Sequence, residues 1–180
     1  MPIISWHFIH QYAHLYASLI NNHFLGYKHI LIFHEQKDLE ALDILSDNVS
    51  YNVFRLLDFY NIEGFDYYDY KQYNQNYLSK SILSELKVRG SSRQFADHQL
   101  LIHLNSYQYI FKTFSPNIHI SEKPSSLSTN SSFAVADKLD IPFLSFSKIP
   151  IENKFNISTN YFGFPDFLEN LPFTGNKNNP

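Results

Sequence analysis

The sequence predicts a three-layer α/β domain built on a mostly parallel sheet. Two apolar runs near the N-terminus, residues 3–6 and 29–33, are separated by a helix-like pattern and a glycine. This is the order of a strand, a crossover helix and a second, parallel strand. The alternation returns later in the chain, where apolar runs at residues 117–121 and 142–146 flank another helix-like pattern. Strands that alternate with helices in this way favour a parallel sheet covered by helices on both faces.

Composition limits the classes of protein to consider. A chain of 180 residues with 44% hydrophobic residues can build the core of one ordinary domain. The formal charge of −3 does not indicate an electrostatic surface for nucleic acid. The absence of Cys excludes disulfides and thiolate metal sites and fits a reducing compartment, so we expect a cytoplasmic protein, with the inner face of the membrane as an alternative location. The N-terminal residues have neither the pattern of a signal peptide nor that of a membrane span.

The first elements follow from hydrophobic periodicity. Residues 3–6 (IISW) are expected to form a strand, and a helix is expected to start directly after Trp6. Its apolar face consists of Phe8, Tyr12, Leu15, Tyr16, Leu19 and Ile20. Gly26 suits the end of this helix, and residues 29–33 (HILIF) are typical of a strand buried on both faces.

The middle of the chain is harder to assign. Residues 38–45 and 52–60 have the pattern of two short helices. Aromatic residues alternate through residues 64–77 (GFDYYDYKQYNQNY), which fits either an edge strand or a loop whose rings pack back onto the domain. We favour a strand followed by a loop.

The pattern is clear again from residue 95 to residue 114, where apolar residues step by four, three, four and three, as in a long amphipathic helix. Ser115-Pro116 ends this helix, because the residue before a proline avoids the α region. A strand at 117–121, a helix from about 127 to 139 and a strand at 142–146 follow. The residues expected to form the core are Ile30, Ile32, Leu104, Phe111, Ile118, Ile120 and Leu144.

A candidate binding site lies in the stretch IHISEKPSS (residues 118–126). Ligands of open parallel sheets bind beyond the carboxyl ends of the strands, which is where Glu122 and a cluster of hydroxyl groups are expected. A helix that begins near Ser126 would direct unpaired N–H groups at this place and suit an anionic or hydroxyl-rich ligand. The alternative is that Ser125, Ser126 or Ser128 only caps the helix, while Glu122 is solvated or pairs with Lys123.

The N-terminal histidines allow two interpretations. His7, His10 and His14 have the three- and four-residue spacing of metal ligands on a helix, but they have no carboxylate among them and their neighbours are aromatic, so we predict no metal site. His7 follows the first strand and should face the same crevice as Glu122. Either residue could act as the general base towards an acceptor hydroxyl. Alternatively, His7 is a residue at a helix start that bonds to the backbone.

Several common catalytic motifs are absent. The sequence contains neither G-x-x-x-x-G-K-[ST] nor G-x-G-x-x-G, so no motif supports a mononucleotide or dinucleotide site of its own. It also lacks the G-x-S-x-G elbow of α/β-hydrolases.

The run SPNIHISEKPSSLSTNSSFAVADKLDIPFLSFSKIPIENKFNIST resembles the N-terminal half of bacterial capsular and surface-polysaccharide biosynthesis proteins of the GT-B glycosyltransferase type. That family has a strand of the form PD-apolar-apolar-SE, a Ser-containing loop, a helix ending in VA-K-LGIP, another strand and an S-RIP-RF segment. The matching pieces here are Pro116-Asn117, Ser121-Glu122, the run from Val135 to Pro142, and Ser147-Lys148-Ile149-Pro150 followed by Phe155. The opening SWHFIH and the run GYKHILIF also match the family's first turn and second strand.

The resemblance implies a division into domains. Residues 1–150 would form a Rossmann-like acceptor-side domain, and residues 151–180 an irregular segment leading towards a second domain that is missing from this chain. Enzymes of this type bind the nucleotide-sugar donor mainly in the C-terminal domain and the acceptor in the N-terminal one. The chain would therefore bind a glycan acceptor and no cofactor, while the nucleotide-sugar donor would bind in the missing domain.

The resemblance also implies roles for residues. Glu122 and His7 would be catalytic, one of them taking the proton of the acceptor hydroxyl as the donor C1 is attacked. Acceptor binding would fall to Ser121, Lys123, Ser125, Ser126, Ser147 and Lys148. The alternative is a non-catalytic sugar-binding module, or a split half that pairs with a second domain or chain carrying the donor site. A remnant without a ligand is the third interpretation, and neither nucleic acid nor a membrane span is expected in any of them.

Overall fold

The computed structural model describes residues 1–180 except residues 9, 35, 62–71, 74, 149–154 and 160–180. The strands are β1 (Ile3–Phe8), β2 (Lys28–Phe33), β3 (Ser50–Arg55), β4 (Ile118–Glu122), β5 (Phe143–Lys148) and β6 (Phe155–Ser158). The α-helices are α1 (His10–His23), α2 (Gln75–Val88), α3 (Arg93–Phe114) and α4 (Leu127–Lys138), and the 3₁₀ helices are η1 (Gln36–Ile44) and η2 (Leu56–Asn61).

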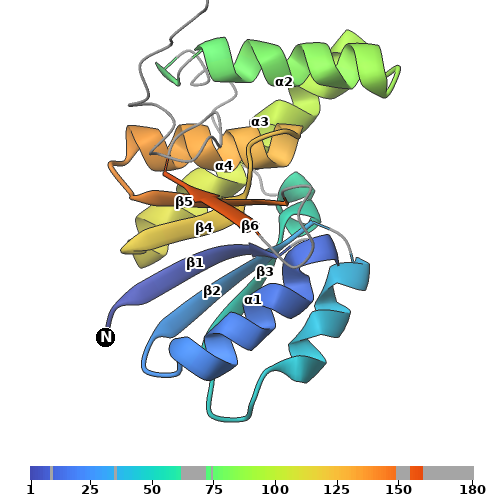
Figure 1. Ribbon diagram of the computed structural model, residues 1–180. Helices are drawn as coiled ribbons and strands as arrows, with labels where there is room; N and C mark the ends of the chain where they lie inside the picture. Colours follow the sequence, from blue (N-terminus) through green and yellow to red (C-terminus); the bar gives the residue numbers. More distant parts are fainter. Residues whose placement is uncertain (9, 35, 62–71, 74, 149–154, 160–180) are drawn as a thin grey trace, which may run out of the picture.

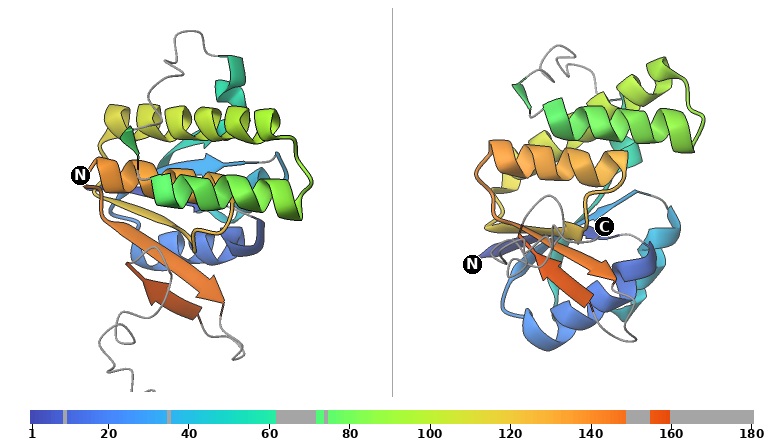
Figure 2. Two further views of the ribbon diagram at one scale, coloured as in Figure 1. Left: turned by 90° about the horizontal axis from the view of Figure 1, so that it is seen from above. Right: turned by 45° about the horizontal axis from the view of Figure 1, so that its top comes forward.

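The strands form one six-stranded sheet in the order β3-β2-β1-β4-β5-β6. All neighbouring pairs are parallel except β5 and β6, which are antiparallel. Helix α1 and η1 cover one face of the sheet, and α3 and α4 cover the other (Figure 1). Helix α2 packs on the outer side of α3 and α4 (Figure 2). The expected mostly parallel, Rossmann-like α/β fold is confirmed.

Alternation along the strands creates a core on each face of the sheet. On β1, Ile4, Trp6 and Phe8 point to the α1 side, where they meet residues such as Tyr16. The intervening residues point to the α3 and α4 side. On β2, Ile30 and Ile32 belong to the core under α3 and α4, whereas Leu31 and Phe33 belong to the core under α1. Both faces of the inner strands are therefore buried, as is typical of parallel sheets.

The helix ends follow local chemistry. Ser92 caps α3 by accepting a hydrogen bond from the N–H of Phe95. At the other end Ser115 adopts a left-handed conformation, with φ 46°, directly before Pro116. The expected end of this helix is therefore confirmed.

Two element boundaries differ from the sequence prediction. Strand β1 does not end at Trp6, because His7 and Phe8 continue the ladder with Ile32 and Phe33 of β2. Residues 52–55 belong to strand β3 and not to a helix. Tyr51, Val53 and Phe54 favour the extended conformation, and β2 offers them a parallel partner. Tertiary pairing overrides the helical pattern at both places.

The structure also contains elements that the sequence did not predict. Helix α2 was not identified, and β6 lies within segment 151–180, for which an irregular structure was expected. Most of segment 64–77 lies outside the described residues, although its last residues begin α2. In the described part of the chain, no helix is both long enough and apolar enough to span a bilayer.

The predicted core residues fall into two groups. Ile30, Ile32, Leu104, Phe111 and Ile120 are buried. Ile118 and Leu144 are only half-buried and pack against the core on the α1 side.

Replacing Ile120 by Ala should lower the free energy of unfolding by about 2–5 kcal/mol, because deletion of a buried side chain leaves a cavity. The side chain of Ile120 is 4% exposed in the middle of the sheet. Urea unfolding measures the change, with Ile157→Ala as the control, since Ile157 on β6 is 52% exposed and should change stability by no more than about 0.5 kcal/mol. A loss below about 1 kcal/mol for Ile120→Ala would contradict this assignment.

Candidate functional site

The sheet changes its winding direction between β1 and β4. The chain leaves β1 into α1 on one face, and it leaves the neighbouring strand β4 into α4 on the other face. The two connections diverge at the carboxyl ends of the strands. In open α/β sheets this divergence is the place where ligands bind.

A column of polar side chains runs along β1 and β4 on the face covered by α3 and α4. Ser5 lies opposite His119 in the parallel register, and the Ser5 hydroxyl lies 3.0 Å from Nδ1 of His119. One step closer to the carboxyl edge, Nδ1 of His7 lies 3.3 Å from the hydroxyl of Ser121. All four residues are buried. The two central strands are thus joined by hydrogen bonds between side chains as well as by their backbone ladder.

His7 extends this column to the helices. Its Nε2 atom lies 3.3 Å from the hydroxyl of Ser128 in the first turn of α4. Ser128 in turn lies 3.2 Å from the hydroxyl of Tyr107 on α3. A neutral imidazole has one donor and one acceptor nitrogen, so one of the two serine hydroxyls donates to His7 and the other accepts from it. Both ring nitrogens of His7 are therefore already engaged within the protein.

Burial keeps this cluster neutral. It lowers the pKa of His7 well below the ordinary value, with smaller contributions from His119 and His34. Burial likewise lowers the pKa of His119 to about 3. It raises the pKa of Tyr107, an effect that the hydrogen bond with Ser128 opposes. At neutral pH the cluster is a chain of uncharged donors and acceptors.

Glu122 ends β4 at the same edge as His7 but on the other face. Ile118 and Ile120 belong to the core under α1, so strand alternation places Glu122 on that side as well. Its carboxylate adds to burial in raising the pKa of Tyr16 on α1. The structure therefore brings His7 and Glu122 to one end of the sheet, as predicted, while the strand pleat directs their side chains to different faces.

The serines before α4 cap the helix. The hydroxyl of Ser126 accepts a hydrogen bond from the N–H of Thr129, and the hydroxyl of Thr129 lies 3.0 Å from the N–H groups of Ser125 and Ser126. This reciprocal arrangement is a capping box. Ser126 is therefore the N-cap, as the capping alternative proposed, and the neighbouring Ser125 is exposed.

The other predicted acceptor-binding residues lie after β4 and at the end of β5. Lys123 follows β4, and its N–H donates to the carbonyl of Phe146 on β5. Ser147 and Lys148 end β5, where they pair with Asn156 and Phe155 of β6. Ser147 is half-buried, whereas the side chain of Lys148 lies outside the described part of the structure.

The histidine spacing that suggested metal binding does not occur on one helix face. His7 belongs to β1, and only His10 and His14 belong to α1. Within the described residues no group of three or more His, Cys, Asp and Glu residues is arranged to hold a metal ion.

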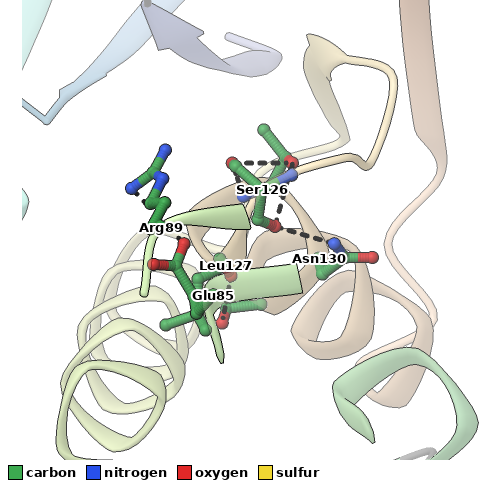
Figure 3. A network of polar contacts seen from close by, with 7 residues as sticks. Glu85, Arg89, Ser126, Leu127 and Asn130 are labelled. Carbon is green, nitrogen blue, oxygen red and sulfur yellow. Dashed lines mark hydrogen bonds and ion pairs between the residues drawn. The ribbon is translucent and has the colours of Figure 1, made fainter. Parts of the chain in front are cut away.

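A second group of polar residues was not predicted. Near the first turn of α4, Glu85 of α2 forms an ion pair with Arg89 at 3.3 Å (Figure 3). The rings of His34 and His103 meet edge to face, with their centroids 5.3 Å apart. His103 lies one turn before Tyr107, within the buried stripe of α3. This helical spacing was the only sequence signal that could have drawn attention to it.

Comparisons with known proteins add a likeness in fold. No protein-family model matches the chain, and no curated protein matches it. Among solved structures, the chain is similar to a cyclodipeptide synthase (CDPS) from Fluoribacter dumoffii. The two share 10% sequence identity over 78% of this chain and 85% of the other, with a TM-score of 0.48. At this level of identity the likeness concerns the fold alone.

The buried histidines should make the protein sensitive to acid. His103 and His119 have pKa values of about 3 in the folded protein, against an ordinary value of 6.5, so the unfolded chain takes up protons first as the pH falls. Stability should be complete above about pH 6.5 and decline towards pH 3, by up to ~1.4 kcal/mol per pH unit for each histidine.

Urea unfolding between neutral and acidic pH measures this dependence. In His119→Gln the free energy of unfolding should decline less steeply as the pH falls, because one of the histidines that cause the decline is gone. Leu83→Ala, which changes an exposed side chain of α2 that does not titrate, should keep the slope of the parent protein. Equal slopes in His119→Gln and the parent protein would show that His119 is not held neutral.

Proposed function

We propose that this chain is the acceptor-binding domain of a glycosyltransferase-like protein in surface-polysaccharide biosynthesis. The glycan would bind at the carboxyl edge of β1 and β4. The observation that carries the proposal is the position of Glu122, which is half-buried at the end of β4, where the connections diverge, and lies four residues before Ser126, the N-cap of α4. A carboxylate at such a place can accept hydrogen bonds from the hydroxyl groups of a sugar.

The backbone supports the resemblance on which the proposal rests. Ser121-Glu122 ends a strand, the run from Val135 to Pro142 joins the end of α4 to β5, and Ser147-Lys148 ends β5. These are the places at which the family has the corresponding pieces. Asp140 stands where the family's LGIP piece has glycine, and its φ of 53° is in the left-handed region that glycine favours.

The chemistry follows from the residues at the edge. Glu122 would take the proton of the acceptor hydroxyl as that oxygen attacks C1 of the donor sugar, while the bond from C1 to the nucleotide's phosphate oxygen breaks and the nucleotide leaves with the bonding electron pair. His7 would act through Ser121, because both of its ring nitrogens are engaged and its side chain is only 1% exposed. The nucleotide-sugar donor would be bound by a second domain or chain, since this sequence has no motif for a nucleotide site. Its lack of Cys fits a reaction in the cytoplasm or at the inner face of the membrane.

The second candidate function is a non-catalytic sugar-binding module that lacks the donor domain or pairs with a partner chain. The engagement of the His7 nitrogens and the capping role of Ser126 favour it, because both groups are already occupied by the protein. The two functions share the acceptor site and differ in whether Glu122 transfers a proton or only holds a hydroxyl.

Glu122→Gln should separate function from stability. The amide keeps the size of the side chain but cannot take a proton, so sugar transfer by a protein that also carries the donor domain should fall far more than stability does. Initial rates and urea unfolding measure the two effects. In the control, Ser92→Ala should lose about 1 kcal/mol of stability through the cap of α3 and keep its turnover, because Ser92 is not among the predicted acceptor-binding residues. Unchanged turnover in Glu122→Gln would show that Glu122 does not transfer the proton. The chain would then be better described as a sugar-binding module.

The chain by itself should transfer no sugar. Without a donor site, donor and acceptor cannot be held together in a reactive geometry. Incubation of the purified chain with a panel of nucleotide sugars and glycan acceptors, followed by mass spectrometry of the products, measures this. Product formed by the chain alone would show that the donor site lies within these residues.

A further inference from the structure

His103 is a buried imidazole whose polar atoms are not used. Its side chain is 2% exposed, and neither Nδ1 nor Nε2 has a hydrogen-bond partner among the residues that the structure describes. A buried polar group without a partner costs about 1–3 kcal/mol. Proteins retain few such groups, and each one calls for a physical explanation.

The buried histidines His7 and His119, on the same face of the sheet, differ from His103 because each has a serine hydroxyl as a partner. His7 lies between the hydroxyls of Ser121 and Ser128, and His119 lies beside the hydroxyl of Ser5. Serine hydroxyls are therefore placed against two of the imidazoles on this side of the sheet. His103 has no such neighbour for either nitrogen in the described part of the chain.

His103 lies at the edge of the sheet where ligands are expected. Its ring contacts the ring of His34, which directly follows the carboxyl end of β2. His34 is half-buried, whereas both nitrogens of His103 are enclosed, so His34 is the side of the pair that borders the surface. Strand β2 is the neighbour of β1, and the pair therefore belongs to the same carboxyl edge as His7 and Glu122.

The charges around His103 determine what it can bind. Burial lowers the pKa of His103 to about 3, and the nearby His34, His7 and Arg89 contribute to the same shift. The ring is therefore neutral at physiological pH and offers one donor and one acceptor. A sugar offers hydroxyl groups that both donate and accept, whereas an ammonium group only donates and a carboxylate only accepts. The two ring nitrogens point in diverging directions, so each matches a separate hydroxyl group: the N–H donates to one, and the other nitrogen accepts from a second.

We propose that His103, with His34 beside it, binds hydroxyl groups of a neutral carbohydrate in a second subsite at the carboxyl edge, on the α3 and α4 side of the sheet. The proposal rests on the function proposed above and adds a contact on the face opposite to Glu122. A glycan that lies across the ends of β1 and β4 would then be held by residues of both faces.

Ring ¹⁵N chemical shifts test this contact directly. Protein labelled with ¹⁵N at histidine is titrated with methyl glucoside, methyl galactoside, N-acetylglucosamine and glycerol, and separately with inorganic phosphate. At least one of the sugars should shift both ring nitrogens of His103, because each gains a hydrogen bond. The signals of His98, at an exposed position of α3, should stay where they are.

Two substitutions separate binding from packing. His103→Phe keeps a ring of similar size and removes the unpartnered nitrogens, so stability should be unchanged or higher. Its affinity for the sugar should fall at least about tenfold, the size expected for the loss of such a hydrogen bond. His103→Gln, which retains a donor and an acceptor, should recover part of the affinity. His98→Phe serves as the matched control on the same helix.

The outcomes distinguish this proposal from the proposed function. If a sugar binds and His103→Phe binds it as tightly as the parent protein, the subsite is wrong and the acceptor function stands. If glycerol alone shifts the His103 ring, the hydroxyl subsite stands and the glycan function is wrong. A response to phosphate alone would show that the subsite binds an anion and not the hydroxyl groups of a sugar, which overturns the proposal. No response of His103 to any of these probes overturns the subsite.

Discussion

The parallel pairing of β1 with β4 is the constraint on which the rest of this structure depends. These neighbours are far apart in sequence, and their register sets Ser5 against His119. The same register brings His7 and Ser121 within reach of each other and allows Ser128 to approach from α4. The helices that follow the two strands go to opposite faces, which opens the carboxyl edge. The polar column and the candidate site both follow from the pairing of β1 with β4.

Pairing of this kind explains why the site has two chemically different sides. Side chains alternate across a strand, so adjacent residues Ser121 and Glu122 face different layers. The α3 and α4 side receives neutral donors and acceptors in a buried setting. The α1 side receives a carboxylate beside the ring of Tyr16. A ligand at the edge would meet both environments within the width of one strand.

Much of the fold could be predicted from periodicity, because the inner strands and α3 are strongly apolar and their spacing is regular. Residues 52–55 could not, since their helical spacing conflicts with a β-sheet partner that only the folded chain supplies. Helix α2 carries buried polar residues, Ser81 and Glu85, which weaken its apolar face as a sequence signal. Regularity within a segment is visible in sequence, whereas a distant partner is not.

For the site, topology was predictable and side-chain direction was not. The position of His7 and Glu122 at one edge follows from the order of strands and helices, but the assignment of their faces required β1 to extend to Phe8. A signal was present in ISWH and IHIS, where polar residues alternate with apolar ones in two buried strands. That pattern predicts a polar column on one face. His103 gave no comparable signal, because a histidine within a helical stripe is as compatible with solvent as with a binding site.

Helix α4 is buried on all sides from Leu127 to Ala136, yet much of it consists of Ser, Thr and Asn. These residues have low intrinsic helix propensity. The hydroxyls of Ser131 and Ser132 bond back to carbonyls within the helix, as is common for these residues in helices. Its helical state is therefore a product of docking between the sheet, α2 and α3. We therefore expect α4 to form late in folding, so that defects in its packing accelerate unfolding far more than they slow folding.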